Sequence, residues 1–132
     1  METFEVRTGL REELVRVTGA LQELVTEKNW RDGALVVFCP HTTAALTVNE
    51  DADPDVAADL VLALSRLLPK EAAGYKHVEG NSDAHVKTTL VGPSLTLIVS
   101  GGRIQLGTWQ GVFLCEWDGP RNRKIWAQWL GQ

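Results

Sequence analysis

The sequence lacks any long hydrophobic run, and it has only two cysteines, three histidines and a small excess of acidic over basic residues. No apolar stretch approaches the roughly 18 residues that a membrane-spanning helix requires, so no membrane segment is expected. The net charge of −4 argues against general binding to nucleic acid or to an anionic membrane. The first residues show neither the basic nor the apolar segment of a secretory signal. Cys39 and Cys115 lie in apolar runs, as expected for buried thiols in a reducing compartment, and we therefore expect a cytoplasmic protein.

The composition is typical of one ordinary globular domain. The 132 residues are 44% hydrophobic and 23% charged, which suffices for one hydrophobic core, and no repeat or linker interrupts them. We expect a single domain over residues 1–132. Four of the five tryptophans follow position 108, so the C-terminal region carries a large share of apolar surface, for the core or for a subunit interface.

Alternating polarity and turn residues predict a chain made mostly of strands. Residues 3–8 alternate in polarity and predict a half-buried strand, and residues 12–17 predict a second strand that could form a hairpin with the first. The apolar run 34–39 predicts a central strand buried on both faces, and Pro40 ends it because proline cannot donate a backbone hydrogen bond. Further strands are predicted at residues 43–48, 94–100, 112–117 and 124–130.

Two main helices are predicted between these strands. The first covers residues 18–28 with Thr18 as its N-cap, and the second covers residues 54–68 with Asp53 as its N-cap. Strands outnumber helices and do not alternate regularly with them. This order indicates an α+β class with a largely antiparallel sheet.

The segment around His77 and His85 is the least regular part of the chain. Residues 70–83 form a long connection without periodicity, and such loops are often functional. Residues 84–91 fit a short helix as well as a strand. Turn-forming residues at 80–83 predict that the chain folds back between the two histidines, which could aim both imidazoles at one point.

The third histidine could complete a shared site. His41 directly follows Pro40, where a strand is predicted to end. If it meets His77 and His85, the three imidazoles would form a site open at a fourth position, as in catalytic zinc centres. The eight-residue spacing of His77 and His85 matches no metal-binding motif, so isolated histidines remain the alternative.

Three further polar groups contain candidate site residues. Residues 49–53 could supply a general base or oxygen ligands for Mg²⁺, or they could form a solvated turn that caps a helix. Gln110, after a glycine that permits close approach of a ligand, can both donate and accept hydrogen bonds, with a strand bulge as the alternative. Arg121 and Arg123 could clamp a phosphate or carboxylate, or an Arg–Asp pair could hold the turn.

Four segments make the chain resemble the YjbQ family, also called the secondary thiamine-phosphate synthase family; they are residues 40–50, 79–87, 94–112 and 116–123. The third segment agrees with the family signature at Ser94, Leu97, Val99, Gly102, Gly107, Thr108, Trp109, Gln110 and Val112. The resemblance extends over residues 4–130. The chain departs from it at Ser82 and Asp83, where Met-Pro is common, and at Trp117, where Phe is common. His85 is kept, so we expect a changed loop wall and an intact site.

The resemblance implies an α+β fold with a β-sandwich-like sheet, a compact homotrimer, and a site near subunit boundaries that uses His41, His77 and His85. It also implies weak thiamine-phosphate synthase activity. That reaction joins a hydroxymethylpyrimidine diphosphate to a thiazole phosphate and releases diphosphate.

The candidate residues are compatible with this chemistry, which needs charge stabilisation on the leaving group. The expected contacts to substrate and phosphate are Asn49, Asn81, Lys87, Gln110, Arg121 and Arg123. Glu50 is a candidate general base, and Glu50 or Asp51 could hold a Mg²⁺ that bridges the diphosphate. Three imidazoles suit Zn²⁺ better than Mg²⁺, so the expected cofactor is a divalent metal, either zinc or magnesium. The alternatives are a zinc-dependent hydrolase and a non-enzymatic trimeric module that binds a small phosphorylated ligand.

Overall fold

Eight strands and three helices succeed one another in a computed structural model that describes residues 1–132. In chain order they are β1 (Glu2–Arg7), β2 (Glu13–Arg16), α1 (Thr18–Glu27), β3 (Gly33–Phe38), β4 (Ala44–Glu50), α2 (Pro54–Leu67), α3 (Ser82–Val91), β5 (Ser94–Ser100), β6 (Arg103–Ile104), β7 (Gln110–Glu116) and β8 (Asn122–Gly131). The predicted α+β class is confirmed, with three helices in place of the two predicted.

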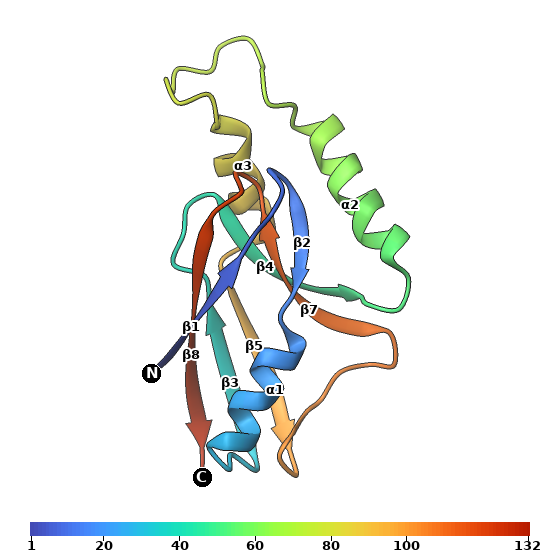
Figure 1. Cartoon of the computed structure of the whole chain (residues 1–132), viewed down its shortest axis with the longest axis vertical. Helices are drawn as coiled ribbons and strands as arrows, with labels where there is room; N and C mark the ends of the chain where they lie inside the picture. Colours follow the sequence, from blue (N-terminus) through green and yellow to red (C-terminus); the bar gives the residue numbers. More distant parts are fainter.

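The strands form two antiparallel sheets, in the orders β1-β8-β3-β5-β6 and β2-β7-β4. Both sheets are curled, and α1 lies at the end of the molecule opposite α3 (Figure 1). One core receives side chains from both sheets and from α1, among them Leu21, Leu35, Val37, Leu46, Val112, Leu114 and Ile125. Full burial of each such side chain stabilises the fold by about 1.5–3 kcal/mol.

The predicted hairpin of residues 3–8 and 12–17 is wrong. β1 pairs with β8 in the larger sheet, whereas β2 pairs with β7 in the smaller one. The strand at residues 33–38 is central as predicted, but it is buried on one face only within the chain. Leu35 and Val37 are fully buried, whereas Phe38 is 38% exposed, because no helix covers the outer face of the larger sheet.

Of the two predicted helix N-caps, the one of α2 is confirmed and the one of α1 is wrong. Asp53 caps α2 as predicted, and its Oδ1 accepts a hydrogen bond from the Asp55 N–H at 2.9 Å. Thr18 is not an N-cap, because α1 already includes it and its Oγ1 instead accepts from the Val112 N–H at 2.8 Å. This bond ties α1 to β7.

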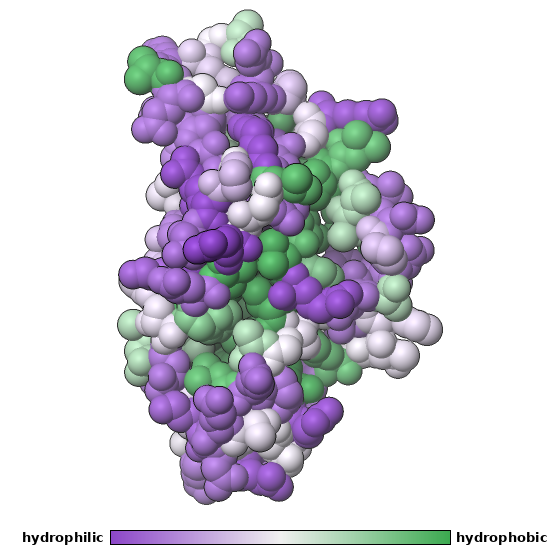
Figure 2. Space-filling view, in the orientation of Figure 1, coloured by the Kyte–Doolittle hydropathy of each residue, from purple (hydrophilic) through white to green (hydrophobic).

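The helices α2 and α3 occupy the outside of the fold. Residues 84–91, for which the sequence fits a helix as well as a strand, lie in the helix α3, which packs on β4. Apolar surface follows the seam between α2 and the sheets (Figure 2), where Leu14, Leu60 and Leu64 line a small cleft. None of the three helices has the length and apolar character needed to cross a membrane.

Candidate functional site

A polar cavity of about 390 Å³ lies where three connections of the chain meet. The first joins β3 to β4, the second leads into α3, and the third is the turn between β7 and β8. Eleven residues line the cavity and none is hydrophobic; they are Pro40, His41, Thr42, Thr43, His77, Glu79, Asn81, His85, Asp118, Arg121 and Arg123. All three histidines of the chain therefore reach one cavity.

Local sequence explains why the chain turns at these points. Pro40 ends β3 and leaves His41 in the connection that follows. The β7–β8 turn passes close to the chain at Leu10, where only glycine fits: a Cβ on Gly119 would lie 2.2 Å from the Leu10 carbonyl oxygen. Asn81 precedes α3, and its carbonyl oxygen accepts from the Ala84 N–H at 3.0 Å. Side chains from three distant segments are thereby directed to one place.

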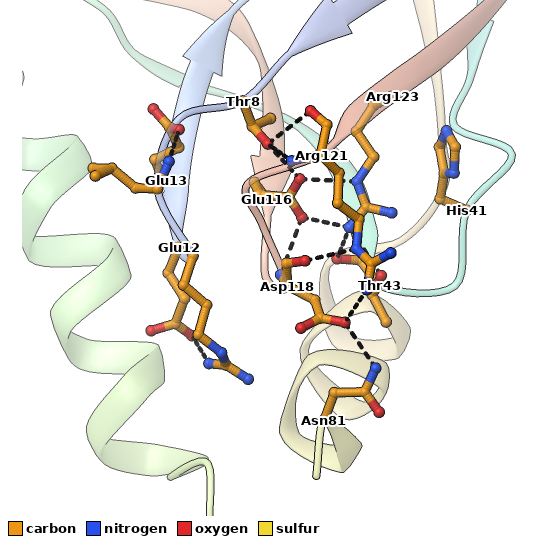
Figure 3. Close-up of polar contacts among 12 residues, drawn as sticks. Thr8, Glu12, Glu13, His41, Thr43, Asn81, Glu116, Asp118, Arg121 and Arg123 are labelled. Atoms are coloured by element: carbon orange, nitrogen blue, oxygen red, sulfur yellow. Dashed lines mark hydrogen bonds and ion pairs between the residues drawn. The ribbon is translucent and has the colours of Figure 1, made fainter. Parts of the chain in front are cut away.

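Arg123 is fixed in the cavity wall by a buried carboxylate (Figure 3). Its Nε donates to Glu116 at 2.9 Å, and its Nη2 donates to Glu116 and, at 2.9 Å, to Thr43 Oγ1. Arg123 is 4% exposed and Glu116 is fully buried. Burial alone would raise the pKa of Glu116, but hydrogen bonds from Arg123 and the Asp118 N–H outweigh it and lower that pKa. Nη1 of Arg123 has no protein acceptor, so this nitrogen is free to bind a ligand.

A second, more exposed arginine is held by Asp118. Arg121 Nε donates to the Asp118 carbonyl oxygen at 2.7 Å, and its Nη2 donates to Asp118 Oδ2 at 3.0 Å. Asn81 Nδ2 donates to the same Oδ2 at 2.7 Å. Burial alone would raise the pKa of Asp118, but hydrogen bonds from Asn81 and Arg121 outweigh it and lower that pKa. Nη1 of Arg121 and Oδ1 of Asp118 are left without protein partners.

His41 is held as a neutral hydrogen-bonding group. Its Nε2 accepts from the backbone N–H of Lys124 at 2.8 Å. Burial, followed by the positive charge of Arg123, lowers the pKa of His41. Because the accepting nitrogen carries no proton, the proton of the neutral ring lies on Nδ1. His41 can therefore offer an N–H donor to a ligand, but it has no unused lone pair.

His77 and His85 contact each other on the α3 side of the cavity. Their ring centroids are 5.3 Å apart and the rings are nearly perpendicular. Nε2 of His77 lies 4.0 Å from a carboxylate oxygen of Glu79. The chain between the two histidines folds back on itself, and this fold brings the two rings together.

A metal centre made of the three histidines does not fit this chain. No group of three or more His, Cys, Asp or Glu side chains is arranged to hold a metal ion. A zinc site would need a free lone pair on each imidazole, and the one on His41 is taken by the N–H of Lys124. The carboxylates expected to hold Mg²⁺, Glu50 and Asp51, do not line the cavity.

Three other predicted site residues lie at the far ends of β4 and β7. Asn49 and Glu50 end β4, and Gln110 is paired with Glu50 at the start of β7. Ala44, the first residue of β4, follows the cavity residue Thr43. Glu50 is six residues beyond Ala44, and at roughly 3.3 Å per residue the strand separates the two by about 20 Å. One chain therefore does not bring these residues to the histidines.

Lys87, predicted to contact phosphate, is engaged elsewhere. It is 1% exposed, and its Nζ donates to Glu12 and, at 2.8 Å, to Asp83 Oδ2. Arg11 binds the same carboxylate from the other side, with Nη2 3.0 Å from Asp83 Oδ1. A ligand could reach Lys87 only by breaking a buried ion pair, so this lysine has a structural role.

Two carboxylates of the site were given no role in the sequence analysis. Glu116 ends an apolar strand, and a charged residue in such a run requires a buried partner. Its position in the sequence could therefore have indicated that it pairs with a buried cation. Glu79 lies in an exposed loop, where sequence offers no signal that it faces the histidines.

Comparison with known proteins gives matches over nearly the whole chain. Residues 2–132 match the family model described as UPF0047 protein YjbQ-like. A UPF0047 protein of Methanocaldococcus jannaschii is 46% identical over 128 residues, covering 97% of this chain and 92% of that protein. UPF0047 protein YugU of Bacillus subtilis is 40% identical over 131 residues, covering 99% of both.

Solved structures agree with the sequence matches. An uncharacterised YjbQ/UPF0047 family protein from Clostridium acetobutylicum superposes with a TM-score of 0.95 at 43% identity, covering 98% of this chain and 100% of that one. A conserved hypothetical protein from Thermus thermophilus gives a TM-score of 0.93 at 42% identity, again covering 98% of this chain and 100% of the other. The fold is thus shared along the full length of these chains.

Proposed function

Because the chain belongs to the UPF0047/YjbQ family, we propose that its polar cavity binds and processes a small phosphorylated molecule, in a reaction like that of thiamine-phosphate synthase. One observation carries this proposal. Two guanidinium groups, each with an unpaired Nη1, meet three imidazoles in a cavity without apolar lining. Arginine is the side chain best suited to phosphate, because its planar group can form paired, charge-assisted hydrogen bonds.

In this reaction the C–O bond between the pyrimidine methylene and its diphosphate breaks, and the electron pair leaves with diphosphate. The thiazole nitrogen then forms the new C–N bond. Arg121 and Arg123 would stabilise the charge that develops on the leaving diphosphate, and Nδ1–H of His41 would add a neutral donor. The ion pairs with Asp118 and Glu116 hold both guanidiniums in place before the ligand arrives.

The alternatives differ in how well they suit the cavity. In a zinc hydrolase, His41 would have to give up its hydrogen bond from the Lys124 N–H in order to bind the metal. The cavity therefore suits phosphate binding better than it suits a zinc centre. A non-enzymatic binding role is favoured by one observation: the cavity holds no serine or cysteine, and of its two threonines, Thr42 and Thr43, the second already binds Arg123. Assay of thiamine phosphate formation from the two phosphorylated substrates separates enzyme from binder. Activity that survives alanine at both His41 and His85 would refute the proposed site.

We predict that Arg121→Ala weakens the binding of diphosphate by about tenfold, as expected for the loss of a hydrogen bond to a charged group. The variant should keep its melting temperature, because the Arg121 side chain is 51% exposed and its ion pair lies at the surface. Titration calorimetry with diphosphate measures the effect. Arg103→Ala removes an exposed arginine that does not line this cavity and serves as the matched control. Equal affinities of the two variants for diphosphate would show that Arg121 does not contact the ligand.

We also propose that the chain forms a homotrimer through the outer face of the larger sheet. Phe38 and Trp126 stack there with ring centroids 5.9 Å apart, and Ile98 and Leu130 are 66% and 56% exposed. A contiguous apolar face without a covering helix marks an interaction surface. The face continues toward the cavity, because Lys124, two residues before Trp126, binds His41. A trimer on this face would therefore place the cavity near a subunit boundary.

Light scattering should then give a mass three times the 14.5 kDa of one chain. Trp126→Glu should dissociate the assembly, because it places a charge beside Phe38 in the apolar face. Leu67→Glu, on an exposed position of α2, is the matched control and should leave the mass unchanged. A monomeric wild-type chain would exclude the trimer.

A further inference from the structure

Two of the segments that line the cavity are both bound by a residue that lies outside it. The β7–β8 turn carries Asp118 and Arg121, and the connection into α3 carries Asn81, whose Nδ2 donates to Asp118 Oδ2 at 2.7 Å (Figure 3). Arg11, which precedes β2, does not line the cavity, yet it forms hydrogen bonds with the turn and with α3. Arg11 is therefore placed to fix the two segments relative to each other.

The backbone of Arg11 holds the β7–β8 turn. Its carbonyl oxygen accepts from the Gly119 N–H at 2.9 Å. Three residues earlier, the Thr8 N–H donates to the Arg121 carbonyl oxygen at 2.9 Å, and Thr8 Oγ1 accepts from the Arg121 N–H at 2.8 Å. The bond from Gly119 uses a backbone atom of Arg11, so a replacement of the Arg11 side chain leaves the turn in place.

The side chain of Arg11 holds the start of α3. Its Nη1 and Nη2 donate to the two carboxylate oxygens of Asp83 at 3.2 and 3.0 Å. Asp83 is fully buried in the first turn of α3, between the cavity residues Asn81 and His85. A bidentate pair fixes direction as well as distance, because the planar guanidinium matches a carboxylate through two parallel bonds. The pair thus fixes the first turn of α3, and with it the position of His85.

We propose that Arg11 is a positioning residue for the cavity, which holds Asn81 and His85 where the ligand requires them. The inference rests on the proposed function, because it takes the cavity as the binding site and assigns a role to a residue outside it. Its effect reaches the ligand through hydrogen bonds, since Asn81 binds Asp118, and Asp118 Oδ2 accepts from Arg121 at 3.0 Å. When the start of α3 shifts, Asp118 loses the amide donor that helps it to orient the guanidinium of Arg121.

Asp83 keeps a cationic partner when Arg11 is replaced, and this separates positioning from folding. Lys87 Nζ donates to Asp83 Oδ2 at 2.8 Å and also to Glu12, so α3 stays attached to the segment before β2. An ammonium is a point charge, and Lys87 lies one turn further along the same helix. It neutralises Asp83 without fixing the direction of the carboxylate. Variants of Arg11 should therefore fold, although α3 is held less firmly.

The test compares Arg11→Met, which removes the charge and the bidentate geometry, with Arg11→Lys, which keeps the charge alone. Titration calorimetry with diphosphate on the full chain measures affinity, and thermal unfolding measures stability. Arg11→Met should weaken the binding of diphosphate by about fivefold and lower the melting temperature. Arg11→Lys should recover most of the melting temperature but little of the affinity, because an ammonium cannot form two parallel bonds to one carboxylate. In a merely structural role, affinity and melting temperature would change together.

The three histidines give a second readout that needs no ligand. Nuclear magnetic resonance of the imidazole nitrogens reports on each ring separately. In both Arg11 variants the signals of His77 and His85 should shift, because the two rings contact each other beside α3. The signals of His41 should stay unchanged, since its Nε2 is held by the Lys124 N–H of β8.

Arg16→Met is the matched control. Arg16 lies in β2, and its guanidinium also pairs with a carboxylate, that of Asp51, but neither residue lines the cavity. This variant should keep the affinity for diphosphate and all three sets of histidine signals.

The outcomes separate this inference from the proposed function. An unchanged affinity in Arg11→Met, or a full recovery of affinity in Arg11→Lys, would overturn the positioning role. Unchanged signals of His77 and His85 would overturn it as well. Failure of the wild-type chain to bind diphosphate would instead overturn the proposed function, and the histidine signals would then still decide whether Arg11 positions the start of α3.

Discussion

Replacing Glu116 with alanine should lower the free energy of unfolding by about 3–5 kcal/mol, because it leaves the guanidinium of Arg123 buried without its counter-charge. Glu116 is fully buried and accepts hydrogen bonds from Arg123, from Thr8 at 2.8 Å and from the Asp118 N–H at 3.0 Å. All three donors lose their acceptor together. For a domain of this size the melting temperature should fall by about 10–20 °C.

Denaturant unfolding followed by fluorescence measures this change, since Trp117 adjoins Glu116 in the chain. Glu116→Gln keeps an acceptor oxygen and should cost less than Glu116→Ala. Glu79→Ala removes an exposed carboxylate and should change stability by less than about 0.5 kcal/mol. A loss below about 1 kcal/mol in Glu116→Ala would show that the pair with Arg123 does not stabilise the fold.

The same carboxylate sets a pH dependence with a definite sign. The folded state lowers the pKa of Glu116, so the ionised form is favoured in the fold. Its contribution to stability is complete above the ordinary pKa of a glutamate, near 4.3, and is lost as the pH falls below that value. Glu116→Gln should therefore show a shallower loss of stability on acidification than the wild-type chain.

Much of the fold could be predicted from local patterns, but strand pairing could not. Alternating polarity located the strands at residues 3–8 and 94–100, and Asp53 before Pro54 located the start of α2. The hairpin prediction failed because alternation shows which face of a strand is buried and not which strand lies beside it. Residues 8–12 cross from one sheet to the other, and Gly9, the one strand-breaking residue among them, fits a hairpin turn as well as a crossing.

The site could be predicted only as far as its histidines and arginines. Each follows a strand end or a turn, and the structure brings them to one cavity. Glu50 and Gln110 share the family pattern with them, but β4 and β7 carry both residues to the opposite end of the sheet. Sequence spacing does not reveal this, because it contains no information about how far a strand extends from a loop.

The helix α3 was left undecided for a related reason. Its buried face consists of Asp83, Ala84, Lys87 and Thr88, so it shows no apolar stripe. The burial is possible because the charges neutralise one another. Asp83, at a position where the resemblance leads one to expect proline, pairs with Lys87 one turn later and with Arg11 from before β2. The departure from the family pattern thus creates an ion pair that fastens α3 to the sheets.

Lys87→Ala should accordingly lower the free energy of unfolding by about 3–5 kcal/mol, because it leaves one uncompensated negative charge among buried groups. Asp83 and Lys87 are 0% and 1% exposed, and the ammonium also lies 5.8 Å from the Trp117 ring centroid. Lys76→Ala, on an exposed residue of the preceding loop, is the matched control and should be neutral.

A double replacement tests whether charge balance is the cause. Asp83→Ala with Lys87→Met removes one charge of each sign and leaves Arg11 and Glu12, 3.6 Å apart, to pair with each other. The double variant should be more stable than Lys87→Ala alone, since an apolar replacement of a whole pair is often neutral. Burial alone would raise the pKa of Asp83, but hydrogen bonds from Arg11 and Lys87 outweigh it and lower that pKa. Without Lys87 the pKa of Asp83 should rise toward its ordinary value, so the single variant, although less stable at neutral pH, should lose less stability on acidification than the wild type. In the double variant this carboxylate makes no contribution to the pH dependence.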